Sequence, residues 1–334
     1  MGADICVLDD TTQSITNNLA FAAYRILAPI YFVIGIIGHS TFIASFRRQY
    51  KHEKAYGYQL LASGSDLIEV IAVSLCMLTR NDLSGYRIGG AIWYEQNYYL
   101  MLIAAKIVSP LELACIATSL LIYVCMAMDR VFAIVDPLKY RTISHTRHQV
   151  VALVMCTILG FSISVFDIFR DNVQLSGDHY IIVTDANYTD TTVAKVLAWV
   201  RNSIFIGGDL ALTAANVAMV VCYRMRGRKQ VGQQFDDIVA KKRKSTQKTL
   251  VMLTVCQSTF TTISMAFNSV YYTFVYSGSA TLTCASKLLS PITNLAILLA
   301  GIAEIFAMLL VYRNFRRKVS KIVCCDEATV HALM

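Results

Sequence analysis

The chain has 334 residues, of which 56% are hydrophobic and only 16% charged, and its formal net charge is +8 at pH 7. This composition excludes an ordinary soluble globular domain, in which about 25% of the residues are charged. The positive charge lies mainly in short loops between apolar segments, which indicates contact with anionic lipid and a protein partner rather than with nucleic acid.

Seven apolar segments follow one another along the chain, each close to the roughly 20 residues that a membrane-spanning helix needs. The predicted spans are 21–46, 56–79, 98–128, 149–169, 195–223, 249–276 and 288–312. The predicted fold is therefore an all-α seven-transmembrane helix bundle over residues 21–312, preceded by an N-terminal segment, 1–20, that has no apolar core and so is no cleavable signal peptide.

Lysine and arginine predict the orientation of the bundle. The loops on one face carry 22 of these residues, whereas the loops on the other face carry five and the segment 1–20 carries none. We therefore expect a multi-pass plasma-membrane protein whose N-terminus is extracellular.

Two features of the extracellular side point to covalent modification. Cys6 and Cys284 are the two cysteines near that face outside helix interiors, and a disulfide between them would tie the N-terminus to the last helix. Packing of Cys284 in the first turn of its span is the alternative. Asn187 begins the sequon Asn-Tyr-Thr in the loop 170–195, and we expect it to carry an N-linked glycan.

The third span ends in the most informative stretch of the chain, Met-Asp-Arg-Val-Phe-Ala-Ile-Val-Asp-Pro-Leu-Lys-Tyr-Arg, residues 128–141. An arginine so close to hydrocarbon needs a partner, and the adjacent aspartate can supply one. The stretch resembles the third-helix signature of rhodopsin-like G-protein-coupled receptors. The resemblance implies that the heterotrimeric G protein is met by Asp129, Arg130, Pro137, Lys139 and Tyr140. An ion pair at the membrane interface, without a signalling role, is the alternative.

The same resemblance implies a polar cluster inside the bundle, formed by Asp66, Ser119 and Glu304. Three side chains with oxygen atoms suit a hard cation such as Na⁺, and two nearby carboxyl groups could instead share a proton. A polar packing network is the alternative. Buried acids in a bilayer are costly, which favours a functional switch.

Glu112 lies in the extracellular third of the third span, where many amine receptors of the family carry an acid. We expect Glu69, on the second span, to approach it, and Asp209 on the fifth span is a further candidate. Such acids favour a cationic ligand through charge pairing in a cleft. The alternative is that Arg25, Lys106 and Arg201 neutralise them.

The basic loops extend the predicted cytoplasmic surface. Clusters of lysine and arginine begin and end the segment 224–248, which is typical of a membrane anchor and, in the family, of the flanks of the G-protein pocket. The pattern of 313–323 predicts a short amphipathic helix on the membrane surface, and Cys324 and Cys325 follow it as candidates for palmitoylation in the tail, 324–334.

The chain also departs from the family pattern. Spans four to six have no proline, and Ala105 stands where the family has the third-helix cysteine of its usual disulfide. This divergence resembles the chemosensory serpentine receptors of nematodes, which implies a chemoreceptor for a small cationic or peptide ligand. An opsin is excluded, because no lysine lies between Leu288 and Tyr312, and nothing indicates an enzyme or a cofactor other than Na⁺. A transporter or channel, or a receptor-like protein that couples to nothing, is the alternative function.

Overall fold

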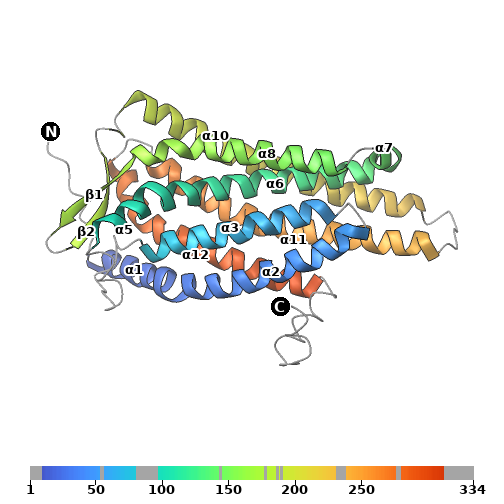
Figure 1. Ribbon diagram of the computed structural model, residues 1–334, viewed down its shortest axis with the longest axis horizontal. Helices are drawn as coiled ribbons and strands as arrows, with labels where there is room; N and C mark the ends of the chain where they lie inside the picture. The colour runs from blue at the N-terminus through green and yellow to red at the C-terminus, as the bar shows by residue number, and fades with distance from the viewer. Residues whose placement is uncertain are drawn as a thin grey trace.

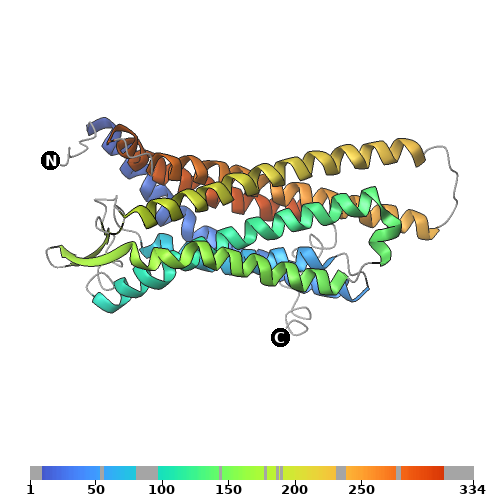
Figure 2. The same cartoon turned by 90° about the horizontal axis from the view of Figure 1, so that it is seen from above.

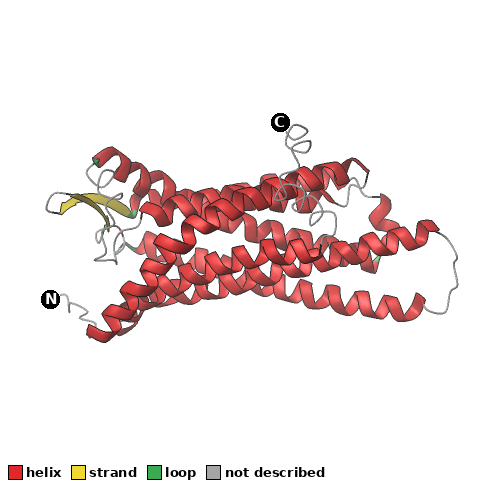
Figure 3. Ribbon diagram, turned by 90° about the horizontal axis from the view of Figure 1, so that it is seen from below, coloured by secondary structure: helices red, strands yellow, loops and turns green. Residues whose placement is uncertain are grey.

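The computed structural model describes residues 10–52, 56–79, 97–142, 145–176, 179–185, 188, 191–230, 238–275 and 280–311. Within these residues, seven helices are long and apolar enough to cross a membrane, which confirms the predicted seven-helix architecture. They lie roughly side by side in an elongated bundle (Figure 1). A two-stranded sheet caps one end, and the short helix α7 lies at the opposite end (Figures 1 and 3). We call these ends the hairpin end and the α7 end.

The first and third spans are each built from three consecutive helical segments, whereas the second is one helix. The first comprises α1 (Asp10–Phe21), a π-helix η1 (Ala22–Leu27) and α2 (Ala28–His52), and the second is α3 (Gly57–Thr79). The third comprises α5 (Tyr98–Ile103), a π-helix η3 (Ala104–Val108) and α6 (Ser109–Val135).

The remaining helices complete the bundle. The short α7 (Pro137–Thr142) leads into α8 (His145–Ser164), which ends in a 3₁₀ turn η4 (Val165–Phe169). The fifth and sixth spans lie in α10 (Thr192–Gln230) and α11 (Ile238–Val275), and the seventh lies in α12 (Ala280–Val311). Both α10 and α11 extend beyond the other helices at the α7 end (Figure 2).

Each π-helix ends two residues before a proline. Pro29 and Pro110 are the second residues of α2 and α6, and η1 and η3 end immediately ahead of those helices. Proline has no backbone N–H and its ring crowds the preceding turn, so a wider turn there relieves the clash. Two of the chain's four prolines therefore widen their helices near the hairpin end.

The helix α6 forms the centre of the bundle. In its most apolar stretch of 18 residues, 72% is buried, against 50% or less in the corresponding stretches of the other six spans. The helix packs against α3, α8, α10 and α11. Gly160 allows α8 to approach closely, since a Cβ there would lie 2.8 Å from the carbonyl oxygen of Ala114 on α6. Small residues at such crossings are typical of helix packing in membranes.

Two local features differ from the sequence-based expectation. The first helix begins at Asp10 rather than near residue 21, because a polar turn, in which the Thr16 hydroxyl donates to the Thr12 carbonyl, continues the helix and packs on α12. The loop after the fourth span contains an antiparallel hairpin of β1 (Asp171–Ser176) and β2 (His179–Thr184), in the register Val173 to Ile182. The run Tyr-Ile-Ile-Val-Thr of β2 is the strand signal that the sequence contained.

Candidate functional site

An ion pair holds the arginine of the third span at the α7 end. The Nη2 atom of Arg130 lies 2.9 Å from Oδ2 of Asp129, and Arg130 is only 4% exposed although it lies near the end of a membrane helix. The Tyr140 hydroxyl donates to the same Asp129 oxygen at 3.0 Å. Asp129 therefore connects Arg130 on α6 with Tyr140 on α7.

The geometry of α7 follows from its first residues. Asp136 ends α6 in a non-helical conformation, its carboxylate accepts a hydrogen bond from the Lys139 backbone N–H at 3.1 Å, and Pro137 begins the new helix. Proline suits this first position, where no backbone donor is needed.

The Lys139 side chain is 79% exposed. Burial raises the pKa of Tyr140 well above its usual range, so its hydroxyl remains a hydrogen-bond donor.

The residues predicted to meet a G protein therefore lie together at one end. Arg130 is buried behind Asp129, while Lys139 is exposed on the neighbouring α7. The backbones of α10 to Gln230 and of α11 from Ile238 carry the basic clusters past this end. The α7 end therefore combines a buried guanidinium with an exposed lysine.

In the middle of the bundle, two of the three predicted core residues converge on a tyrosine. The Tyr123 hydroxyl lies 2.7 Å from Oδ2 of Asp66 and 3.0 Å from Oε1 of Glu304. Gln257 donates from Nε2 to the same Glu304 oxygen at 3.3 Å, and Ser119 hydrogen-bonds to Ser65 at 2.8 Å. The sequence-based prediction missed the tyrosine, which lies one helical turn after Ser119.

A small cavity surrounds this cluster. Its polar lining includes both core acids, Ser119, Tyr123, His39 and Glu69. Among the described residues, no three His, Cys, Asp or Glu side chains are arranged to hold a metal ion.

A second cavity lies nearer the hairpin end and contains Glu112. Residues of α11 and α12 form one side of it: Asn268, Tyr271, Ser290, Thr293, Asn294 and Ile297. Ser109, Asp167 and Arg170 line the other side. Glu112 is 8% exposed and comes from the first turn of α6, directly after the π-helix.

The other two predicted ligand acids lie elsewhere. Glu69 lines the mid-bundle cavity with Asp66, whereas Glu112 lines the cavity nearer the hairpin end. The two carboxyl groups are nevertheless close enough to interact electrostatically, and their joint role in binding a ligand stays a prediction. Asp209 is half-buried on α10, faces Thr262 of α11 and lines neither cavity. The facing of a helix inside a bundle cannot be assigned from one sequence, so the sequence did not predict which cavity each acid lines.

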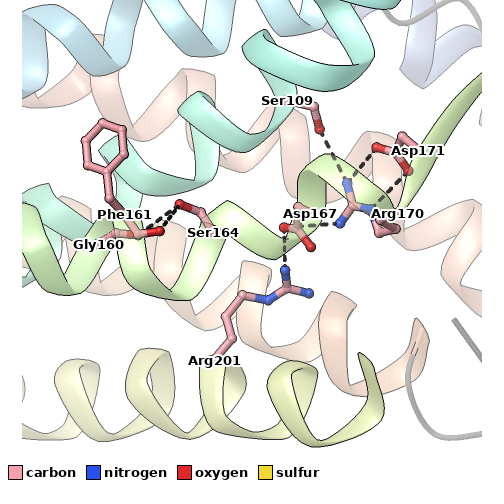
Figure 4. Close-up of polar contacts among 8 residues, drawn as sticks. All are labelled: Ser109, Gly160, Phe161, Ser164, Asp167, Arg170, Asp171 and Arg201. Atoms are coloured by element: carbon pink, nitrogen blue, oxygen red, sulfur yellow. Dashed lines mark hydrogen bonds and ion pairs between the residues drawn. The ribbon is translucent and has the colours of Figure 1, made fainter. Parts of the chain in front are cut away.

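A network of charges fastens the hairpin to three helices (Figure 4). Asp167 of η4 accepts a hydrogen bond from Nη1 of Arg201 on α10 at 2.6 Å and lies 3.6 Å from Arg170. Arg170 binds both carboxylate oxygens of Asp171, at 3.0 and 2.9 Å, and its Nη2 donates to Ser109 of α6 at 3.3 Å.

Lys106 adds a second attachment, by donating to the Ile168 carbonyl and the Asn172 side chain, each at 2.8 Å. Of the cations named as alternatives for neutralising Glu112, Lys106 binds η4 and β1, and Arg201 binds Asp167. The fastening of the hairpin was not predicted, although the spacing of Asp167, Arg170 and Asp171 was visible in the sequence.

Several predicted sites lie outside the described residues. They are Cys6 and the side chain of Cys284, Asn187, the amphipathic segment 313–323, and Cys324 and Cys325. Their predicted modifications and the membrane-surface helix remain predictions.

Comparison with known families adds one finding. The model of the family described as 7 transmembrane receptor (rhodopsin family) matches residues 88–304, which is more than half of the chain. The match covers the third span and its Asp-Arg pair, and it ends at Glu304. No curated protein matches the chain.

Proposed function

Because the chain belongs to the rhodopsin family of seven-transmembrane receptors, we propose that it is a G-protein-coupled chemoreceptor of the plasma membrane. It binds a small cationic or peptide ligand at the hairpin end and promotes nucleotide exchange on a heterotrimeric G protein at the α7 end. The observation that carries the proposal is the placement of an acid-containing pocket and a restrained, buried arginine at opposite ends of one helix, α6.

The distribution of charge supports the orientation. The loops at the α7 end hold the large majority of the lysines and arginines outside the spans, so this end faces the cytoplasm and the hairpin faces outwards. Asn187 then lies outside, and Cys324 and Cys325 lie beside the inner leaflet, where palmitate can attach. A disulfide between Cys6 and Cys284 is part of the same proposal.

The charges of the hairpin-end pocket support a cationic ligand. In the network of Figure 4, Asp167 pairs with Arg170 and Arg201, and Asp171 pairs with Arg170. Glu112 adds a further carboxylate to the cavity, together with amide and hydroxyl groups that can orient a ligand. An ammonium group beside Glu112 gains from the low dielectric around a side chain that is 8% exposed.

The α7 end provides the switch. In the state described here, Asp129 holds Arg130 against its own helix, so the guanidinium is unavailable to a partner. Ligand binding that favours a more open bundle would expose Arg130 between α7 and the extended ends of α10 and α11.

The test is nucleotide exchange in membranes that hold the surface-expressed chain, with several Gα classes and a panel of amines, basic peptides and volatile compounds. Arg130→Ala should abolish a response that the wild type gives, whereas Lys139→Met, an exposed residue at the same end, should lower it only modestly. Glu112→Gln should weaken cationic ligands by about tenfold to a hundredfold and leave neutral ligands unchanged.

The result that contradicts the proposal is silence of the well-expressed wild type, basal exchange included, across all Gα classes. Flux recordings would then test the transporter or channel alternative.

A further inference from the structure

The centre of the bundle is bridged by a single hydroxyl group. Tyr123 of α6 lies between Asp66 of α3 and Glu304 of α12, at 2.7 and 3.0 Å. Tyr123 is 1% exposed, and the two acids are 6% and 7% exposed. Three spans that are far apart in the sequence therefore meet at one oxygen atom.

The number of protons on these three groups decides whether both contacts of Tyr123 can be hydrogen bonds. A phenol has one proton, so it can donate to one carboxylate only. The second short contact is also a hydrogen bond if the other carboxyl group carries a proton and donates it to the phenolic oxygen. Two ionised carboxylates at this separation would repel each other, whereas one shared proton removes half of the charge.

The surrounding groups complete the network. Gln257 of α11 donates to Glu304, which brings a fourth span into contact. His39 of α2 places Nδ1 3.8 Å from the Asp66 carboxylate. Glu69 of α3 and Tyr31 of α2 line the same cavity.

We propose that the Tyr123 hydroxyl takes the place of a cation at the centre of this cluster and latches α3, α6 and α12 together through a shared proton. The latch holds the bundle in the state described here and makes that state insensitive to Na⁺. Its role in receptor switching rests on the proposed function, whereas the latch itself does not.

The latch is connected to the hairpin-end pocket. Ile297 of α12 lines both cavities, and it precedes Glu304 by seven residues, about 10 Å along the helix. Glu112 and Tyr123 likewise lie on one helix, α6. A ligand that moves α12 against α6 therefore stretches the contacts of Tyr123, which couples the two sites.

The test is thermal unfolding of the purified full chain in lipid nanodiscs, with NaCl or choline chloride at equal ionic strength. The wild type should melt at the same temperature in both salts. Tyr123→Phe should melt about 2–4 °C lower in choline chloride, because the two acids lose their bridge. It should also gain a stabilisation by NaCl, because a cation can now occupy the space between them.

Two further variants separate this effect from a simple packing defect. Tyr123→Phe/Glu304→Gln removes one acid, so it should lose the stabilisation by NaCl that Tyr123→Phe shows. Tyr58→Phe, at another buried tyrosine, should show no difference between the two salts. A wild type that NaCl stabilises as strongly as it stabilises Tyr123→Phe would overturn the proposal, and so would a Tyr123→Phe variant that melts like the wild type in both salts.

Basal nucleotide exchange gives an independent measurement. Tyr123→Phe should raise basal exchange several-fold if the chain is a receptor. If the salt effects are observed but the chain never activates a G protein, the proposed latch stands and the proposed receptor function is wrong. If the chain signals through Arg130 but Tyr123→Phe shows no salt effect, the proposed receptor function stands and the proposed latch is wrong.

Discussion

At the scale of single residues, Asp129 has two roles at the α7 end. It pairs with the buried Arg130 and accepts a hydrogen bond from Tyr140. One contact of Asp129 restrains Arg130, and the other attaches α7. Two conservative substitutions can test these contacts individually.

We predict that Asp129→Asn costs about 3 kcal/mol of stability, because it removes the charge that compensates a buried guanidinium. It should also raise basal nucleotide exchange, because Arg130 loses its restraint. Tyr140→Phe removes only the hydrogen bond and should cost about 1 kcal/mol. Thermal unfolding and exchange assays on the same membranes measure both effects, and equal basal activities of the two variants would contradict the separate roles.

At the scale of elements, the hairpin is fastened without the family's usual disulfide. Ala105 stands where the cysteine is expected, and the next residue, Lys106, donates one hydrogen bond to Asn172 of the hairpin and one to Ile168 of η4 instead. Arg170 and Asp171 add the second attachment. A charge-assisted anchor of this kind is screened by salt where it is exposed and is unaffected by reducing agents.

We predict that Lys106→Met increases hydrogen exchange of the β1 and β2 backbone amides about tenfold, because the hairpin loses its tie to the third span. Lys139→Met is the matched control, since it removes an exposed lysine at the other end of the bundle and should leave these amides unchanged. Hydrogen exchange followed by mass spectrometry makes the measurement, with and without a reducing agent. A large effect of the reducing agent on the wild type would show that a covalent tie exists after all.

The same elements show what the sequence could predict. Long apolar runs predicted the seven spans, because hydrophobic length depends on composition alone. The contacts of Tyr123 could not be predicted, because a tyrosine in an apolar run has the same pattern whether it packs or bridges acids. Which cavity Glu69 and Glu112 each line depends on helix rotation, which packing partners determine and local sequence does not.

At the scale of the whole molecule, the proposed mechanism depends on which end of the bundle faces the cell exterior. An inverted bundle would place Arg130 outside and exclude G-protein coupling. The charge bias of 22 against five strongly favours the proposed orientation, since each exposed lysine or arginine gains about 1 kcal/mol near an anionic inner leaflet. The bias arises from many loops together, so no single substitution should reverse it.

We predict that a glycosidase specific for N-linked glycans shifts the mobility of the chain from intact cells, and that Asn187→Gln abolishes this shift. A membrane-impermeant thiol reagent should reach Cys324 and Cys325, once their acyl groups are removed, only after the cells are permeabilised. The two measurements address opposite faces, so they must agree if the bundle has one orientation. Labelling of these cysteines in intact cells would place the basic surface outside, and it would remove the structural basis for G-protein coupling even if every helix lay where it is described here.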